Sequence, residues 1–225
     1  MVVGRGTFGP VRLAWMDAAA SAPLAADVLA RFGDQQRRRF AALEEPAARR
    51  FLAGRRLLAA LIDEAHEGAD LTMGSTCERC GAEHGRPRFA RVPVEVSVSY
   101  AGDIVAVAAV ACAHASGVGI DIERRPSDGA DSPLGGLAPL FAPGRPPSTS
   151  EWTLLEAALK ADGRGVTADL STVRIGDHAS GSLPGSRAVL MPWRSDSVDA
   201  AVIPGPEGHV ISAAVARPAA ASRAA

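Results

Sequence analysis

Two acids stand one residue apart inside an apolar run near the middle of the chain. The segment 117–125 reads GVGIDIERR, so Asp121 and Glu123 interrupt residues that are typical of a buried β-strand. Removing a carboxylate from water costs free energy unless a partner compensates for it. By the period of two along a strand, both side chains project from the same face. They belong either to a solvated strand face or to a site that holds a ligand.

Another acid and a lysine lie further along the chain. Glu156 and Lys160 are four residues apart, which makes them neighbours on a helix surface. Taken alone, such a pair is typical of a surface ion pair. Combined with Asp121 and Glu123, the pair would complete an oxygen-rich, negative pocket of the kind that binds Mg²⁺, with a lysine that could stabilise phosphate charge. These residue types outline a site for phosphate transfer.

Hydrophobic patterns predict the strands that carry the first two acids. Residues 94–100 alternate valine with polar side chains, residues 104–110 are apolar, and Gly102 with Asp103 supplies a turn between them. This pattern predicts a β-hairpin, and the segment 117–123 is the next strand. Further strands are expected near residues 11–15 and at residues 170–175, 187–191, 199–203 and 209–216.

The helices are predicted from capping signals and from helical spacing of apolar residues. We expect helices over residues 24–43 and 44–68. A later helix begins at Ser148, which forms a capping box with Glu151, and it ends at Gly163. Most of the arginines outside the motifs are expected on a solvated helix face: Arg37, Arg38, Arg39, Arg49, Arg55 and Arg56.

The order of elements is helices followed by strands, twice along the chain. It predicts an α+β protein with two halves, residues 1–115 and 116–225. The segment 126–149 is rich in Pro, Gly and Ser and is expected to be a flexible connection. The carboxylates and the lysine described above all lie in the second half.

Composition excludes several classes of protein. The chain has 225 residues, with 24 basic against 25 acidic side chains, so its charge gives no reason to expect nucleic acid as a partner. The three cysteines are too few for the disulfide framework of a secreted protein. No apolar run is long enough for a membrane helix, and the amino terminus has no uninterrupted apolar stretch. We expect a cytoplasmic protein without a membrane partner.

Several segments, in this order, resemble the Sfp-type 4'-phosphopantetheinyl transferases. GVGIDIE at 117–123 resembles the family pattern G-[IV]-D-[IV]-E, and WTLLEAALKADGRG at 152–165 resembles W-[ST]-x-K-E-[AS]-x-x-K with a following Gly-x-Gly turn. Upstream, ARRFLAGRRLL at 48–58, HGRPRF at 84–89 and VSVSYAGDIVAVA at 96–108 resemble R-x-L-L-G, G-K-P and N-[IL]-S-H-S-G-x-x-V. The resemblance implies a pseudo-twofold monomer in which each half is a helix packed on a small, mainly antiparallel sheet.

The resemblance also implies a role for each matched residue. Asp121, Glu123 and Glu156 would bind Mg²⁺, or Mn²⁺ in its place, and Glu156 would also act as the base for the acceptor serine. Lys160 would assist at the pyrophosphate of coenzyme A. Leu155 replaces the lysine that the family has before the metal-binding glutamate. The positions that match contacts to coenzyme A are Arg50, Arg86, Ser99 and Tyr100, the last in place of the family's usual histidine.

The implied reaction transfers the 4'-phosphopantetheine arm of coenzyme A to a serine of an apo acyl or peptidyl carrier protein and releases adenosine 3',5'-bisphosphate. One alternative is a non-catalytic homologue that binds coenzyme A or a carrier protein. Another is a zinc-stabilised interaction domain, in which Cys77, Cys80 and His84 bind Zn²⁺ together with Cys112 or His114.

Overall fold

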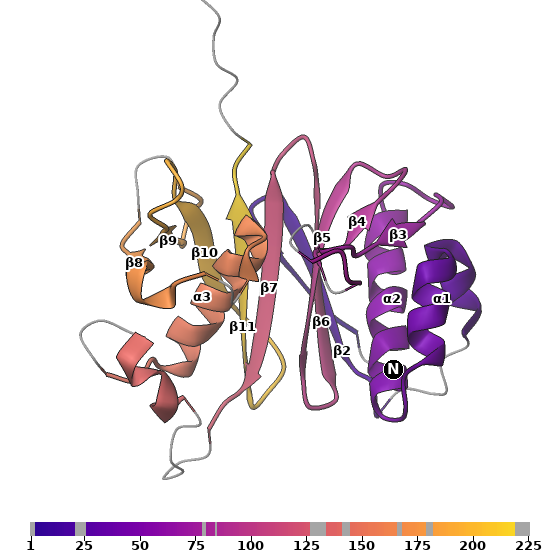
Figure 1. The fold of residues 1–225 in the computed structure, drawn as a ribbon, viewed down its shortest axis with the longest axis horizontal. Coiled ribbons are helices and arrows are strands. Elements are labelled where there is room, and N and C mark those ends of the chain that lie inside the picture. Colours follow the sequence, from indigo (N-terminus) through magenta and orange to yellow (C-terminus); the bar gives the residue numbers. More distant parts are fainter. Residues whose placement is uncertain are drawn as a thin grey trace, which may run out of the picture.

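The computed structural model describes residues 3–20, 26–77, 80–83, 85–126, 134–140, 145–165, 168–178 and 182–218. The described chain forms two antiparallel sheets with helices packed against them, which confirms the predicted α+β class. Figure 1 shows the two sheets side by side, with α1 and α2 at one end of the molecule and β8 and β9 at the other. No helix in the described part of the chain has the length and apolar character needed to cross a membrane.

The N-terminal sheet is built from strands between residues 3 and 111, in the order β1-β2-β6-β5-β4-β3. The predicted hairpin is confirmed as β5 and β6, with Ala101 opposite Ile104 across its turn. Three strands were not predicted, because β1 is glycine-rich and β3 and β4 are two residues long. The strands are β1 (Val3–Phe8), β2 (Val11–Asp17), β3 (Met73–Gly74), β4 (Arg88–Phe89), β5 (Val94–Ala101) and β6 (Ile104–Ala111).

The helices of the first half are shorter than predicted. Instead of one helix over residues 24–43, the chain forms the 3-10 helix η1 (Ala26–Phe32) and helix α1 (Asp34–Ala41). Gly33 separates them with φ of 82°, a left-handed conformation that ends helical geometry and that glycine adopts without strain. The next predicted helix is confirmed as α2 (Ala47–Asp63).

The C-terminal sheet is built from strands between residues 117 and 216, in the order β7-β11-β10-β9-β8. The prediction at 170–175 was partly wrong, since the 3-10 helix η4 (Leu170–Thr172) precedes the short strand β8. Another 3-10 helix, η2 (Gly135–Leu140), lies within the predicted connection. The strands are β7 (Gly117–Arg124), β8 (Arg174–Gly176), β9 (Arg187–Leu190), β10 (Val198–Ile203) and β11 (His209–Ala216).

Helix α3 (Thr149–Asp162) has the predicted ends. The Ser148 hydroxyl accepts a hydrogen bond from the Glu151 amide at 3.2 Å, and the Glu151 carboxylate accepts one from the Ser148 amide at 2.8 Å. Arg145 donates to the same carboxylate over 2.9 and 2.5 Å. At the other end Gly163 is left-handed, with φ of 93°. The capping box thus fixes where the helix that carries Glu156 and Lys160 begins.

Strand β6 shows how the layers pack. Its Val105 and Val107 belong to the core under α2, whereas Ala106 and Ala108 belong to the core shared by the two sheets. A separate core lies between α3 and the C-terminal sheet, with Leu159 among its buried members. Because both faces of β6 are buried, its sequence is apolar throughout.

Strand β7 and helix α3 approach each other closely through two glycines. A Cβ atom on Gly119 would lie 1.8 Å from the backbone oxygen of Ala157, and one on Gly117 would lie 2.1 Å from that of Ala161. Both distances are far below van der Waals contact. The absence of side chains at these positions therefore sets the spacing between strand and helix, and with it the spacing of the acids that each carries.

We predict that Gly119→Ala lowers the free energy of unfolding by about 1–3 kcal/mol or more, because the added methyl group would clash with helix backbone that cannot turn aside. Chemical denaturation measures this loss. Gly136→Ala is the control, since a Cβ atom there meets nothing within 4 Å. Equal stability of the two variants would contradict the close contact.

A second prediction concerns the capping box. The hydrogen bonds from Arg145 lower the pKa of Glu151 to about 2, below its usual value of 4.5. A carboxylate with a lowered pKa stabilises the fold above its usual pKa, and this contribution is lost as the pH falls toward the lowered value. Glu151→Gln should be less stable than wild type at neutral pH. The difference in free energy of unfolding between the two proteins should become smaller as the pH falls from about 5 to about 3.

Urea denaturation across this range measures the gap between Glu151→Gln and wild type. Glu67→Gln, which alters an exposed side chain, is the matched control and should show no such convergence. A gap for Glu151→Gln that is constant with pH would show that its carboxylate does not stabilise α3 in the way described.

Candidate functional site

The four residues first singled out meet where β7 lies against α3. Ile120 and Ile122 of β7 point into the core between the sheets, so Asp121 and Glu123 project from the other face, as the alternation predicts. Glu156 and Lys160 project from α3 toward the same place, and Lys160 contacts the carboxylate of Asp121. The structure thus brings together three carboxylates and one lysine from two elements.

Lys160 is the most heavily bonded residue of this group. Its Nζ atom lies 2.6 Å from Oδ1 of Asp121, a carboxylate that is almost fully buried. It also donates to Oγ of Ser99 and to the backbone oxygen of Ile120, both at 3.1 Å. Oε2 of Glu156 is 3.7 Å away. All three donor directions of the ammonium group are therefore used inside the protein.

Two serines of β5 join the N-terminal sheet to the free edge of β7. The amide of Ile120 donates to Oγ of Ser97 at 3.2 Å, and the amide of Ile122 donates to Oγ of Ser99 at 3.4 Å. Ser99 also donates to Oδ1 of Asp121 at 2.8 Å. The alternating pattern of β5 located both serines on one face, but it did not reveal that they bond to another sheet.

The carboxylates repel one another at this position. Burial, followed by the charge of Asp121, raises the pKa of Glu156, while Lys160 acts in the opposite direction. Burial and Asp121 likewise raise the pKa of Glu123, against a hydrogen bond from Trp152 that lowers it. Nothing in the sequence pattern indicated this polar contact of Trp152. The raised pKa values favour the protonated forms of both glutamates, so one lysine does not offset the repulsion among the three carboxylates.

One oxygen of the group has no donor. Oδ2 of Asp121 is buried without a hydrogen-bond partner among the described residues, and the Glu156 carboxyl lies within hydrogen-bonding range of the Asp121 carboxyl. A divalent cation between the two would supply the missing positive partner, and carboxylate oxygens are the ligands that Mg²⁺ prefers. The donor set therefore fits such an ion.

The carboxylates do not form a closed metal site as they stand. In the described part of the chain, no group of three or more His, Cys, Asp or Glu side chains is arranged to hold a metal ion. At this position the ion pair between Lys160 and Asp121 fills part of the space between the acids. A cation bound here would have to share the Asp121 carboxylate with Lys160.

Arg86 lies at the carboxyl end of α3 and has its own partner. Its Nη2 atom is 2.8 Å from Oε2 of Glu95, an ion pair rather than a well-directed hydrogen bond, and both side chains are mostly buried. Its Nη1 atom is 3.5 Å from the backbone oxygen of Ala161. Burial lowers the pKa of Arg86. Glu95 was not singled out from the sequence, because nothing local indicates its partner.

Arg50 and Tyr100 lie on the α2 side of the N-terminal sheet. Arg50 is half-buried, with Nη1 4.0 Å from Oδ1 of Asp103 in the β5-β6 turn. The Tyr100 hydroxyl lies close to Gly54 of α2, 3.4 Å from where a Cβ atom would be, and its side chain is partly exposed. Ser99, the neighbour of Tyr100, points to the opposite face, toward β7.

Arg55 is buried beside Tyr100, so its expected place on a solvated face was wrong. It donates to Oε1 of Gln36 over 3.0 and 2.7 Å, and its guanidinium lies 4.1 Å from the ring centroid of Phe51. Burial lowers its pKa to about 10, and Tyr100 is a hydrogen-bonding partner that opposes this shift. A positive charge thus lies next to Tyr100.

The zinc interpretation stays a prediction, because the described residues include only part of its ligand set. Cys77, Cys80 and Cys112 form no disulfide with one another. His84 lies outside the described residues, and those that are described, including His114, contain no cluster arranged to hold a metal. Burial raises the pKa of the Cys112 thiol, which disfavours the thiolate that binds zinc.

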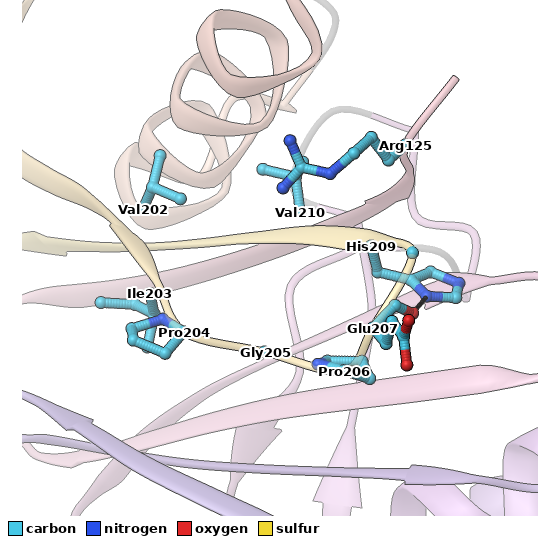
Figure 2. Close-up of a pocket in the computed structure, with 10 residues that line it drawn as sticks. Arg125, Val202, Ile203, Pro204, Gly205, Pro206, Glu207, His209 and Val210 are labelled. Atoms are coloured by element: carbon cyan, nitrogen blue, oxygen red, sulfur yellow. Dashed lines mark hydrogen bonds between the residues drawn. The ribbon is translucent and has the colours of Figure 1, made fainter. Parts of the chain in front are cut away.

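A hollow of about 540 Å³ lies at the β10-β11 hairpin, and its wall residue Val210 pairs with Glu123 of β7. Figure 2 shows Arg125 beside Val210, and the rest of the wall is formed by residues 202–209, which include the hairpin turn and His209. Apolar and backbone groups dominate this wall. The bonded cluster around Lys160, not this hollow, is therefore where chemistry is concentrated.

The chain was also compared with known proteins. It matches no protein-family model, and no curated protein matches it. The chemistry of the site therefore has to be inferred from its own residues and contacts.

Proposed function

We propose that this protein transfers the 4'-phosphopantetheine arm of coenzyme A to a serine hydroxyl of an apo acyl or peptidyl carrier protein. The observation that carries the proposal is the meeting of Asp121, Glu123, Glu156 and Lys160 between β7 and α3. Three carboxylates with a deficit of positive charge suit Mg²⁺, and the nearby ammonium group suits a phosphate. The motifs that resemble the transferases supply exactly these side chains.

In this proposal each residue of the cluster has a task. Asp121, Glu123 and Glu156 would hold Mg²⁺, which when bound would neutralise the pyrophosphate of coenzyme A. Glu156 accepts the proton of the acceptor serine as the serine oxygen bonds to the β-phosphorus and the pyrophosphate bond breaks. Lys160 stabilises the negative charge on adenosine 3',5'-bisphosphate as it leaves. Lys160 must move from Asp121 to do so.

The α2 side of the N-terminal sheet supports the same substrate. Arg50, Tyr100 and the buried Arg55 place two cations and a hydroxyl group at neighbouring positions on α2 and β5. Such groups suit the 3'-phosphate of coenzyme A, and Arg55 would supply the positive charge that Tyr100 lacks. Arg86 would take part only by exchanging its contact with Glu95 for one with the substrate.

The test is incubation of the protein with apo carrier protein, coenzyme A and Mg²⁺, followed by intact mass measurement of the carrier. We predict a mass gain of one phosphopantetheine group, which a chelator abolishes. Asp121→Ala and Glu156→Ala should each reduce the rate at least about a hundredfold, because they remove a cation ligand or the base. Asp177→Ala, which alters an exposed carboxylate on the same half, is the matched control and should keep the wild-type rate.

Carriers from fatty-acid, polyketide and peptide synthesis should all be offered. If none gains the mass, the transferase proposal is wrong. Binding of coenzyme A without transfer would instead favour a non-catalytic homologue. Stoichiometric zinc with indifference to magnesium would favour the interaction domain.

A further inference from the structure

Ser97 and Ser99 occupy equivalent places on β5. Both are buried, lie two residues apart on the same face, and accept a hydrogen bond from an amide of β7. They differ in one respect, because Ser99 alone also contacts Asp121 and Lys160. Comparing variants of the two serines therefore distinguishes the effect of the bond between the sheets from any effect on the candidate site.

The hydroxyl of Ser99 is fully used by these contacts. A serine hydroxyl has one hydrogen to donate and two lone pairs that accept. The hydrogen goes to Oδ1 of Asp121 at 2.8 Å, and the lone pairs accept from Nζ of Lys160 at 3.1 Å and from the amide of Ile122 at 3.4 Å. No bonding capacity is left for a phosphate of coenzyme A, the contact that the resemblance implies for this residue.

The same contacts decide which way the Asp121 carboxylate faces. Oδ1 takes the bonds from Ser99 and Lys160, so Oδ2 is left without a donor, within a carboxyl group that adjoins Glu156. Rotation of the carboxylate would break both bonds to Oδ1. Ser99 thus fixes one oxygen and leaves the other for a ligand.

We propose that Ser99 is a positioning residue, which orients Asp121 toward a divalent cation and holds Lys160 beside it, and that it does not contact coenzyme A. The part of this inference that concerns turnover rests on the proposed function. The part that concerns the cation does not. An outer contact of this kind to a metal-binding carboxylate typically changes metal affinity by about 10–100-fold.

The test compares Ser99→Ala with Ser97→Ala. Both variants lose one bond to β7, and Ser99→Ala also loses the bonds to Asp121 and Lys160, so both unfolding midpoints should fall and that of Ser99→Ala should fall further. The affinity for Mn²⁺, measured by electron paramagnetic resonance on the protein without substrate, should fall at least about tenfold in Ser99→Ala and stay within about twofold of wild type in Ser97→Ala. Ser99→Cys keeps the size of the side chain but is a poor hydrogen-bonding group, and it should behave as Ser99→Ala does.

Transfer kinetics supply a second readout. A positioning role predicts that Ser99→Ala lowers kcat with the KM for coenzyme A unchanged, whereas a substrate contact would raise KM. Equal Mn²⁺ affinity in the Ser99 and Ser97 variants, absence of Mn²⁺ binding by wild type, or a raised KM with unchanged kcat would overturn the inference. If wild type binds Mn²⁺ with the predicted sensitivity to Ser99 but transfers nothing, the inference stands and the proposed function fails.

Discussion

Lys160 binds Asp121 at the point where β5, β7 and α3 meet, and both side chains also bond to Ser99 of the N-terminal half. Removing Lys160 would leave the buried carboxylate of Asp121 without its counterpart charge, which is strongly destabilising. Strand β7 is the edge of its sheet, and the hydroxyls of Ser97 and Ser99 satisfy amides that an exposed edge would offer to other chains. Several of the side chains that connect β5, β7 and α3 therefore also belong to the candidate site.

Elements with a strong period were predictable from the sequence. In the hairpin of β5 and β6 an alternating strand and an apolar strand flank a glycine turn, and α3 has a capping box at Ser148 and a glycine at its end. In both places the local signals and the tertiary structure agree. The break at Gly33 was missed because a single glycine is tolerated inside a helical pattern. The short strand β4 pairs with β5 and β3 pairs with β4, and no local sequence pattern indicates these pairings.

Side-chain positions that follow from the period of a single strand or helix were predicted correctly. Contacts between segments far apart in the sequence were not predicted. Alternation along β7 placed Asp121 and Glu123 on one face, and helical spacing placed Lys160 one turn from Glu156. The ion pair between Arg86 and Glu95 and the burial of Arg55 against α1 depend on how distant segments pack. Such contacts become visible only in three dimensions.

The central claim is that the junction between β7 and α3 binds a divalent cation. Amide chemical shifts recorded during a Mg²⁺ titration test it most directly, because they locate the ion without relying on catalysis. The account predicts that the largest changes fall on residues 119–123 and 156–160, which surround Asp121 and Lys160. Unchanged resonances in both segments, or changes centred on residues 77–80, would contradict it.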